Sequence, residues 1–250
     1  EELMNGQGFV SVMTKYVKTV KSFVASWSAS IPGTLMTVEA EVMNASQFNC
    51  GVGQHSEEGS SACMGIALMM TQMYFTKSFP DFKNVRDVLP MFMGIIQKAC
   101  DLWKKDGTGP LTVNEAITKL KVDTQLEIAA ETWWPTTPGA VPKSPVQLVT
   151  EFYINSMKKN KCQAMVFTLK PNHTFVVLIN EKGDQLLLDS HLHYSSANLT
   201  YHETIVKPGT GAAVAFLPSG TSPQWLVEDY PAIINSSSSY GEITQIIPKN

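Results

Sequence analysis

The chain has 250 residues, of which 44% are hydrophobic and 16% are charged, and its formal net charge is −3. This composition can bury a sizeable core, and one compact domain is expected at this length. The absence of a basic surplus argues against nucleic acid as a partner. No apolar run in the sequence approaches the roughly 20 residues that a membrane-spanning helix needs, so we expect no membrane partner either.

The first quarter of the chain predicts one helix, one strand and a loop. Apolar residues recur at close to helical spacing over residues 8–29, which predicts an amphipathic helix that a Pro-Gly pair terminates. Alternation over Leu35–Met43 predicts a strand, and the polar segment 44–62 predicts a long loop. From Cys63 the sequence CMGIALMMTQMYFTK is apolar nearly all round, which is typical of a helix buried inside a domain.

The middle of the chain predicts three further helices. They are expected over Asn84–Lys105, Leu111–Leu120 and Pro145–Asn160. Pro90 predicts a break or restart in the first of them, and Ser144 is a suitable N-cap for the last. Residues 132–145 hold four prolines and two tryptophans, which predicts an ordered, exposed loop.

The last third of the chain predicts an antiparallel sheet. Strands are expected over Ala164–Leu169, Thr174–Ile179, Gln185–Asp189 and Ala212–Leu217. The segment NEKGD between the second and third strands predicts a tight hairpin with Gly183 as its turn residue. A mostly helical first half followed by a mostly antiparallel second half predicts an α+β fold.

The four cysteines predict reduced thiols and no disulfide framework. They are Cys50, Cys63, Cys100 and Cys162. Their spacing is wide and irregular, and a chain of this length does not need covalent staples. We therefore expect an intracellular, cytoplasmic compartment.

Cys63 is the candidate nucleophile because it opens the apolar helix. The dipole and the unsatisfied amides of a helix N-terminus stabilise a thiolate, which predicts a lowered pKa for this thiol. The small residues at 59–62 would let a substrate backbone approach the sulfur and leave N–H groups to hold an oxyanion. The alternative is a plain buried cysteine that packs as a small hydrophobe.

Two arrangements could supply the base and the acid that a nucleophilic cysteine requires. In the first, His173 begins one strand of the hairpin and Asp189 ends the next, so antiparallel pairing places them side by side. That order and placement match the helper residues of papain-like enzymes. In the second, Asp189 and His191 form the pair, because residues two apart on an extended chain project from the same face.

A metal site is a further alternative. Asp189, His191 and His193 repeat at a spacing of two and could offer three ligands from one edge, with His202 or His55 as a fourth, as in a catalytic zinc site. No second cluster of Asp, Glu or His lies nearby in the sequence to support such a site. Thiol chemistry is therefore favoured, and neither a metal nor a cofactor is expected.

Two blocks of the sequence resemble a known family. The block GQHSEEGSSACMGIALMM and the run from MVFTLKPNHTFVVLINEKGDQLLLDSHLHY to GAAVAFLPSG are similar to the herpesvirus large-tegument-protein deubiquitinases and their non-viral tegument-like relatives. This resemblance implies a papain-like cysteine peptidase fold. We accordingly expect a single catalytic domain over residues 1–250, with a helical extension over 1–34 and the papain-like core over 35–240.

The resemblance also implies residue roles. It implies Cys63 as the nucleophile, His191 as the general base, Asp189 as the acid that orients it and Gln54 as the oxyanion-hole side chain, with His173 as the alternative base. The implied activity is removal of ubiquitin, or of a ubiquitin-like protein, by isopeptide hydrolysis in a monomeric enzyme without a cofactor. A catalytically inactive module that binds ubiquitin is the other function that this fold would allow.

Overall fold

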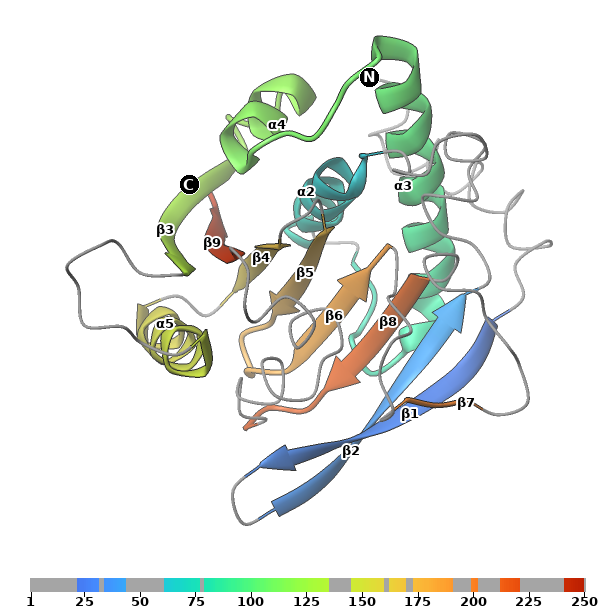
Figure 1. The fold of residues 1–250 in the computed structure, drawn as a ribbon, viewed down its shortest axis with the longest axis vertical. Coiled ribbons are helices and arrows are strands. Elements are labelled where there is room, and N and C mark those ends of the chain that lie inside the picture. The colour runs from blue at the N-terminus through green and yellow to red at the C-terminus, as the bar shows by residue number, and fades with distance from the viewer. Residues whose placement is uncertain are drawn as a thin grey trace.

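The described part of the chain forms an antiparallel sheet with helices on both faces (Figure 1). The computed structural model describes residues 22–31, 34–43, 61–76, 79–134, 145–159, 162–169, 173–190, 199–201, 212–220 and 241–249. Within these ranges the strands are β1 (Ser22–Ile31), β2 (Thr34–Met43), β3 (Leu126–Trp134), β4 (Gln163–Leu169), β5 (His173–Ile179), β6 (Gln185–Asp189), β7 (Leu199–Tyr201), β8 (Ala212–Leu217) and β9 (Gly241–Pro248). Their order is β3-β9-β4-β5-β6-β8-β2-β1-β7, and all neighbours pair antiparallel. The predicted α+β class is confirmed.

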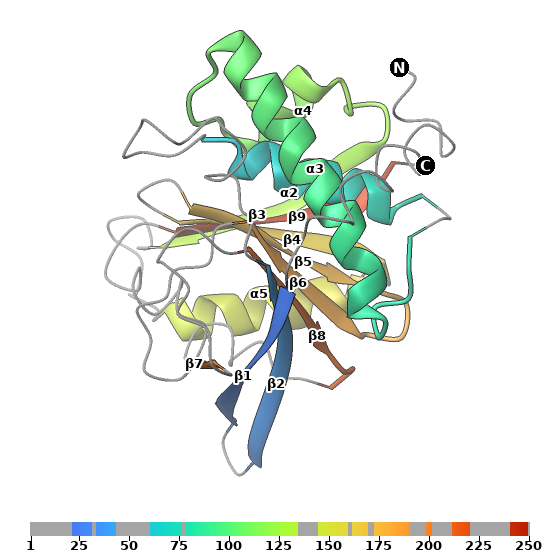
Figure 2. The same cartoon turned by 90° about the vertical axis from the view of Figure 1, so that its right-hand side faces the viewer.

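The helices divide between the two faces of the sheet. They are α2 (Cys63–Tyr74), α3 (Val85–Asp106), α4 (Val113–Leu120) and α5 (Pro145–Lys159). Figure 2 shows α2, α3 and α4 on one face and α5 on the other. Alternate strand residues serve the two layers: Val176, Leu178 and Leu188 join the core under α2 to α4, whereas Phe167 and Phe175 stack outside that core cluster.

Helix α2 lies at the centre of the molecule, as its apolar sequence predicts. Its residues from Cys63 to Gln72 are buried, because the helix packs against β5 on one side and against α3 and α4 on others. Gly65 faces the indole ring of Trp103 from α3 so closely that any β-carbon would overlap the ring. The first turn of α2, which carries Cys63, is therefore held in place by this contact.

The predicted break at Pro90 is wrong, because α3 runs through it as one helix. A proline in a helix removes one backbone hydrogen bond and costs roughly 3 kcal/mol. Buried residues both before and after Pro90, among them Val88, Phe92 and Trp103, offset that cost. The predicted short helix is confirmed as α4, which begins with a capping box between Thr112 and Glu115.

The predicted helix over residues 8–29 is wrong where the structure describes it. Residues 22–29 belong to β1, which pairs with β2 along its whole length. Ala25, Trp27, Ala29 and Ile31 alternate with serines or other short residues, and this period of two outweighs the partial helical spacing. Residues 8–21 of the predicted helix lie outside the described ranges, and the predicted strand over 35–43 is confirmed as β2.

Strands β3 and β9 were not predicted. Residues 132–134 of the predicted loop belong to β3, and residues 135–144 lie outside the described ranges. Strand β9 lies between β3 and β4 in the sheet. The expected papain-like core, which ended at residue 240, therefore leaves out an interior strand of the sheet. Likewise the expected helical extension over 1–34 contains β1. Strand β9 pairs with segments remote in the sequence, which local signals do not reveal, whereas β1 was missed although its partner β2 follows it directly.

No helix within the described ranges combines the length and the apolar character that crossing a bilayer requires.

Four predicted strands agree with β4, β5, β6 and β8 to within one residue. The predicted hairpin is also confirmed, with Gly183 at a φ of +83° in the left-handed region that glycine adopts without strain.

Replacing Gly65 by alanine should destabilise the protein although alanine is the better helix former. The added methyl group would overlap the Trp103 ring, and overpacking of a core costs about 1–3 kcal/mol, more than the roughly 1 kcal/mol that alanine gains in a helix. Urea unfolding measures the change. Gly109→Ala, where an added β-carbon meets nothing within 4 Å, is the control, and an unchanged midpoint for Gly65→Ala would contradict the packing described.

Candidate functional site

The start of α2 and the start of β5 meet at one end of the sheet. Cys63 is the first residue of α2, and His173 is the first residue of β5. Strand β6, which pairs with β5, ends at Asp189. Three residues from separate parts of the chain are thereby placed at the same end of two neighbouring strands.

His173 and Asp189 form a buried pair. The Nε2 atom of His173 lies 3.0 Å from each carboxylate oxygen of Asp189, and the two residues are 6% and 0% exposed. The sheet register explains the contact, because Asp189 pairs with Phe175, two residues along from His173 on the same face. This is the first of the two arrangements that the sequence left open.

Aromatic rings support the imidazole from the side. The ring of Phe175 meets His173 edge-on at a centroid distance of 5.8 Å and stacks on Phe167 at 4.7 Å. Together with the carboxylate of Asp189, these rings fix the orientation of the imidazole. An orientation of this kind is what a general base requires, because proton transfer depends on the direction of the accepting nitrogen.

The thiol of Cys63 forms hydrogen bonds with Thr174, the residue that follows His173. Both the hydroxyl and the backbone of Thr174 form hydrogen bonds with the Cys63 sulfur, and the backbone of Met64 forms a third. Because Thr174 is the chain neighbour of His173, the thiol and the imidazole lie at the same end of β5. The charge of Asp189 is also near enough to act on Cys63.

The predicted lowering of the Cys63 pKa is wrong. Burial raises the pKa of this thiol above its ordinary value, and the carboxylate of Asp189 adds to the rise. The hydrogen bonds from Thr174 and Met64 act in the opposite direction because they stabilise the thiolate, yet they do not offset the loss of solvation. Cys63 is only 5% exposed, so the resting site holds a protonated thiol that needs a base.

The first turn of α2 offers backbone donors beside the sulfur. Ala62 is the N-cap, and its carbonyl accepts from the N–H of Ile66 at 2.9 Å. The amides of the first turn have no carbonyl within the helix to bind, which suits them to an oxyanion. Ser61, just before the cap, has a φ of +54°, a strained left-handed conformation for a residue other than glycine.

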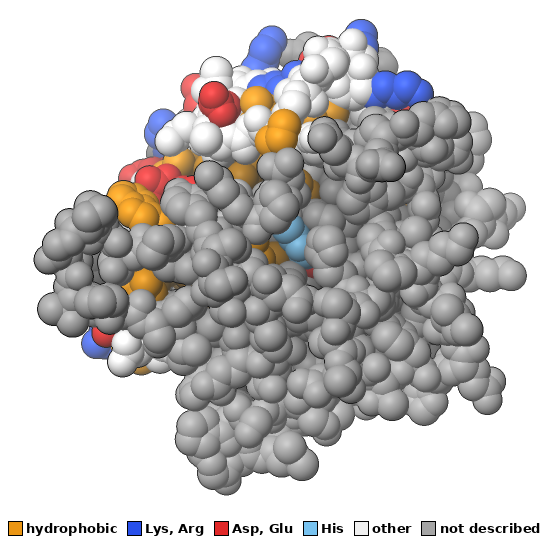
Figure 3. Space-filling view, viewed as in Figure 1, with side chains coloured by type: hydrophobic (Ala, Val, Ile, Leu, Met, Phe, Trp, Pro, Cys, Tyr) orange, Lys and Arg blue, Asp and Glu red, His pale blue; other side chains and the backbone are white. Residues whose placement is uncertain are grey.

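A cavity of about 320 Å³ adjoins Cys63. Its walls combine apolar side chains with hydroxyls and carboxylates, contributed by α2, α4, β4, β5 and β9. The lining residues are Ser61, Cys63, Met64, Pro110, Leu111, Thr112, Val113, Glu115, Thr168, Leu169, Thr174 and Glu242. Figure 3 shows histidine atoms at the bottom of a hollow in the face of Figure 1, close to hydrophobic side chains.

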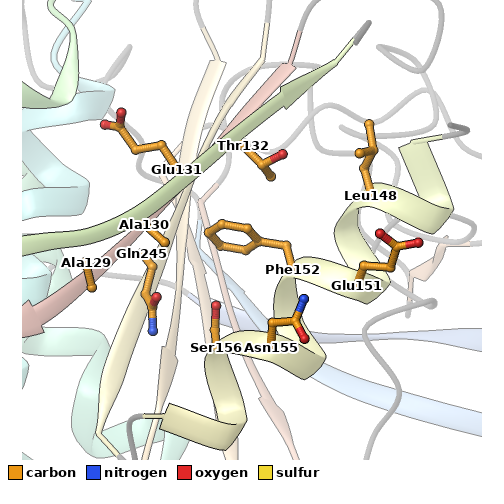
Figure 4. Close-up of a pocket in the computed structure, with 10 residues that line it drawn as sticks. All are labelled: Ala129, Ala130, Glu131, Thr132, Leu148, Glu151, Phe152, Asn155, Ser156 and Gln245. Carbon is orange, nitrogen blue, oxygen red and sulfur yellow. The ribbon is translucent and has the colours of Figure 1, made fainter. Parts of the chain in front are cut away.

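A second cavity, of about 460 Å³, lies between β3 and α5 and is separate from Cys63. Figure 4 shows Phe152 pointing from α5 toward β3, with Glu131 and Glu151 on either side. Its lining includes no cysteine or histidine. The first cavity is therefore the one next to Cys63 and Thr174, although His173 and Asp189 do not line it.

The structure brings together Cys63, Asp189 and His173 of the predicted site residues. The other predicted residues lie outside the described ranges: His191, His193, Gln54, His55 and His202. Among the described residues, no group of three or more His, Cys, Asp and Glu side chains could hold a metal ion. The three described cysteines, Cys63, Cys100 and Cys162, carry reduced thiols.

Thr174 and Glu242 were missed by the sequence analysis. Thr174 could have been identified, since it directly follows a histidine proposed to act on Cys63. Glu242 could not, because it lies on β9, a strand that was not predicted. Its place in the cavity follows from a pairing with β4 far upstream.

Thr174→Val should raise the pKa of Cys63 further, because it removes the side-chain hydrogen bond that stabilises the thiolate. A lost hydrogen bond of ordinary strength should slow alkylation by roughly 2- to 10-fold at mildly alkaline pH. The rate with iodoacetamide is measured against pH by mass spectrometry of the peptide that contains Cys63. Thr168→Val, on the adjacent strand, is the control. The midpoint of the rate against pH gives the pKa of Cys63. If this midpoint stays unchanged or falls in Thr174→Val, the contact between Thr174 and Cys63 is refuted.

No model of a protein family matches this chain, and no curated protein matches it. The resemblance to tegument deubiquitinases thus stays a prediction from the motifs alone. The geometry around Cys63 is the basis on which the function is proposed.

Proposed function

We propose that this protein is a cysteine peptidase of papain-like topology in which Cys63, His173 and Asp189 form the catalytic triad. The observation that carries the proposal is the buried contact of His173 with both carboxylate oxygens of Asp189, next to a residue that binds the Cys63 thiol. A nucleophile, a base and an orienting acid are the three parts that thiol proteases share.

His173 is the general base in this proposal, in place of His191. With Nε2 donating to Asp189, the imidazole presents Nδ1 as the nitrogen that takes the thiol proton. Because burial keeps the Cys63 proton in place at rest, the transfer accompanies attack on the substrate carbonyl. A bond forms between the Cys63 sulfur and the carbonyl carbon. The carbon–nitrogen bond of the substrate then breaks as the protonated His173 delivers its proton to the leaving amine, which leaves a thioester.

The carboxylate of Asp189 holds the tautomer of His173 and stabilises the imidazolium that forms in the reaction. Its complete burial keeps water from competing for the hydrogen bond. The backbone amides at the start of α2 stabilise the tetrahedral oxyanion, because a helix N-terminus directs N–H donors at developing negative charge. Gln54 is kept as the side-chain contributor that the motif resemblance suggests.

The proposed substrate is a protein conjugated to ubiquitin or to a ubiquitin-like protein, cleaved at the isopeptide bond. This part rests on the resemblance of the Cys63 and Asp189 blocks to the tegument deubiquitinases. Cys63 lines a cavity of about 320 Å³. This space beside the sulfur supports the binding of an extended segment of the substrate. Water then hydrolyses the thioester and restores the thiol.

A ubiquitin carrying a C-terminal electrophile should label the protein irreversibly through Cys63. Cys63→Ala should abolish the labelling, because the thiolate forms the covalent bond, whereas Cys162→Ala should retain it. Intact mass spectrometry measures the adduct. Activity that a chelator removes, with no adduct at Cys63, would instead favour the alternative metal site at Asp189, His191 and His193.

His173→Ala should lower kcat/KM by about 10³-fold or more, the usual effect of losing a triad member. His191→Ala should have a much smaller effect if His173 is the base. Both variants are compared with the wild type on a ubiquitin C-terminal fluorogenic substrate, and thermal unfolding checks that each remains folded. A larger loss of kcat/KM in His191→Ala than in His173→Ala would instead identify His191, in the Asp-x-His motif, as the general base.

A further inference from the structure

Glu242 is a half-buried carboxylate that the proposed mechanism does not use. It lines the cavity beside Cys63, and burial raises its pKa, with a further rise from the negative charge of Glu131. Among the described residues that line this cavity, none is lysine or arginine. The carboxylate accepts a hydrogen bond from the Thr244 hydroxyl at 3.3 Å, but this does not offset the loss of solvation and the like charge, an unfavourable state that a bound cation would relieve.

A row of side chains connects Glu242 with the nucleophile. Thr174 pairs with Thr168 across β5 and β4, and Thr168 pairs with Glu242 across β4 and β9. Residues paired directly across strands project from the same face, and neighbouring strands lie about 4.8 Å apart. The backbone of Glu242 is therefore about 10 Å from that of Thr174, which itself contacts the Cys63 thiol.

Thr168 supplies a second polar group in this row. Its Oγ1 atom is buried and has no hydrogen-bond partner among the described residues, although it lines the same cavity. The other acidic residue that lines the cavity, Glu115, is occupied, because its Oε2 accepts from both the backbone N–H and the hydroxyl of Thr112 at 2.8 Å. The polar end of the cavity is thus formed by Glu242 and Thr168.

Apolar side chains also line the cavity, among them Met64, Leu111 and Leu169. A ligand that satisfies both parts has a long apolar stem and a cationic tip. The side chains of lysine and arginine have this character, since their methylene stems pack on apolar surface while the charged head seeks a carboxylate.

We propose that Glu242, together with the Thr168 hydroxyl, forms a subsite beside Cys63 for a lysine or arginine side chain of the substrate. This inference rests on the proposed function for its meaning, since it names the class of residue that the peptidase accepts next to the cleaved bond. Glu242 acts as the specificity determinant, and the chemistry at Cys63 does not pass through it.

Matched chloroacetamides test the subsite without requiring any peptidase activity. The probes are N-(5-aminopentyl)-, N-pentyl- and N-(5-carboxypentyl)chloroacetamide, in which the Cys63 thiolate displaces chloride and only the tail differs. The ratio of labelling rates at Cys63 cancels the reactivity of the thiol. A charged hydrogen bond in a partly buried site should make the amino probe about tenfold faster than the pentyl probe.

Variants identify the groups responsible. Glu242→Gln should bring the amino-to-pentyl ratio to about one, Glu242→Lys should make the carboxypentyl probe the fastest, and Thr168→Val should lower the ratio in part. Glu131→Gln is the control, because Glu131 does not line this cavity. It removes a charge that raises the pKa of Glu242, so it should keep or increase the preference. An unchanged rate for the pentyl probe shows that the variants retain the Cys63 site.

Equal rates for the amino and pentyl probes in the wild type, or a ratio that survives in Glu242→Gln, would overturn the subsite. The proposed function fails separately, through the absence of labelling by the ubiquitin electrophile. A cationic preference without that labelling supports the subsite and refutes the substrate, and the reverse result refutes only the subsite.

Discussion

The packing of α2 against β5 is the contact on which the rest of the site depends. It brings Cys63, at the start of the helix, to Thr174, next to His173 at the start of the strand. The close approach of Trp103 to Gly65 holds the first turn of the helix against this strand. Any change that moves α2 would separate the thiol from Thr174, although His173 and Asp189 would keep their pairing within the sheet.

Burial has opposite consequences for the groups of this site. It raises the pKa of Cys63 and so keeps the thiol protonated, which makes it a poor nucleophile without a base. For the contact between His173 and Asp189 burial is favourable, because a carboxylate without competing water binds an imidazole more firmly. At Glu242 burial leaves a carboxylate without a cation among the described lining residues. Low access to water thus strengthens the contact between His173 and Asp189, raises the pKa of Cys63 and leaves Glu242 as a carboxylate that a cation would stabilise.

Local sequence signals predicted the elements that lie in the core. The apolar run after Cys63, the capping residues around Thr112 and the hairpin turn at Gly183 each determine a local conformation, and each prediction agrees with the structure. The failures have different causes. Strand β1, whose partner β2 follows it directly, reads partly as a helix because its apolar residues also fit a helical spacing. Strand β9 obtains its hydrogen bonds from β3 and β4, which are remote in the chain. Pro90 is the converse case, since core packing on both sides of it overrides a local signal to end the helix.

By itself, the sequence determined that Cys63 opens a buried helix and that His173 and Asp189 lie side by side at the open end of a hairpin, because turn residues and apolar periodicity act locally. It did not determine which histidine Asp189 binds, since His173 and His191 both satisfy the spacing rules of a strand. Only the tertiary structure paired Asp189 with His173, through the register of β5 and β6. It alone also placed Glu242 in the cavity of Cys63, because a side chain from β9 reaches that cavity only when β9 pairs with β4.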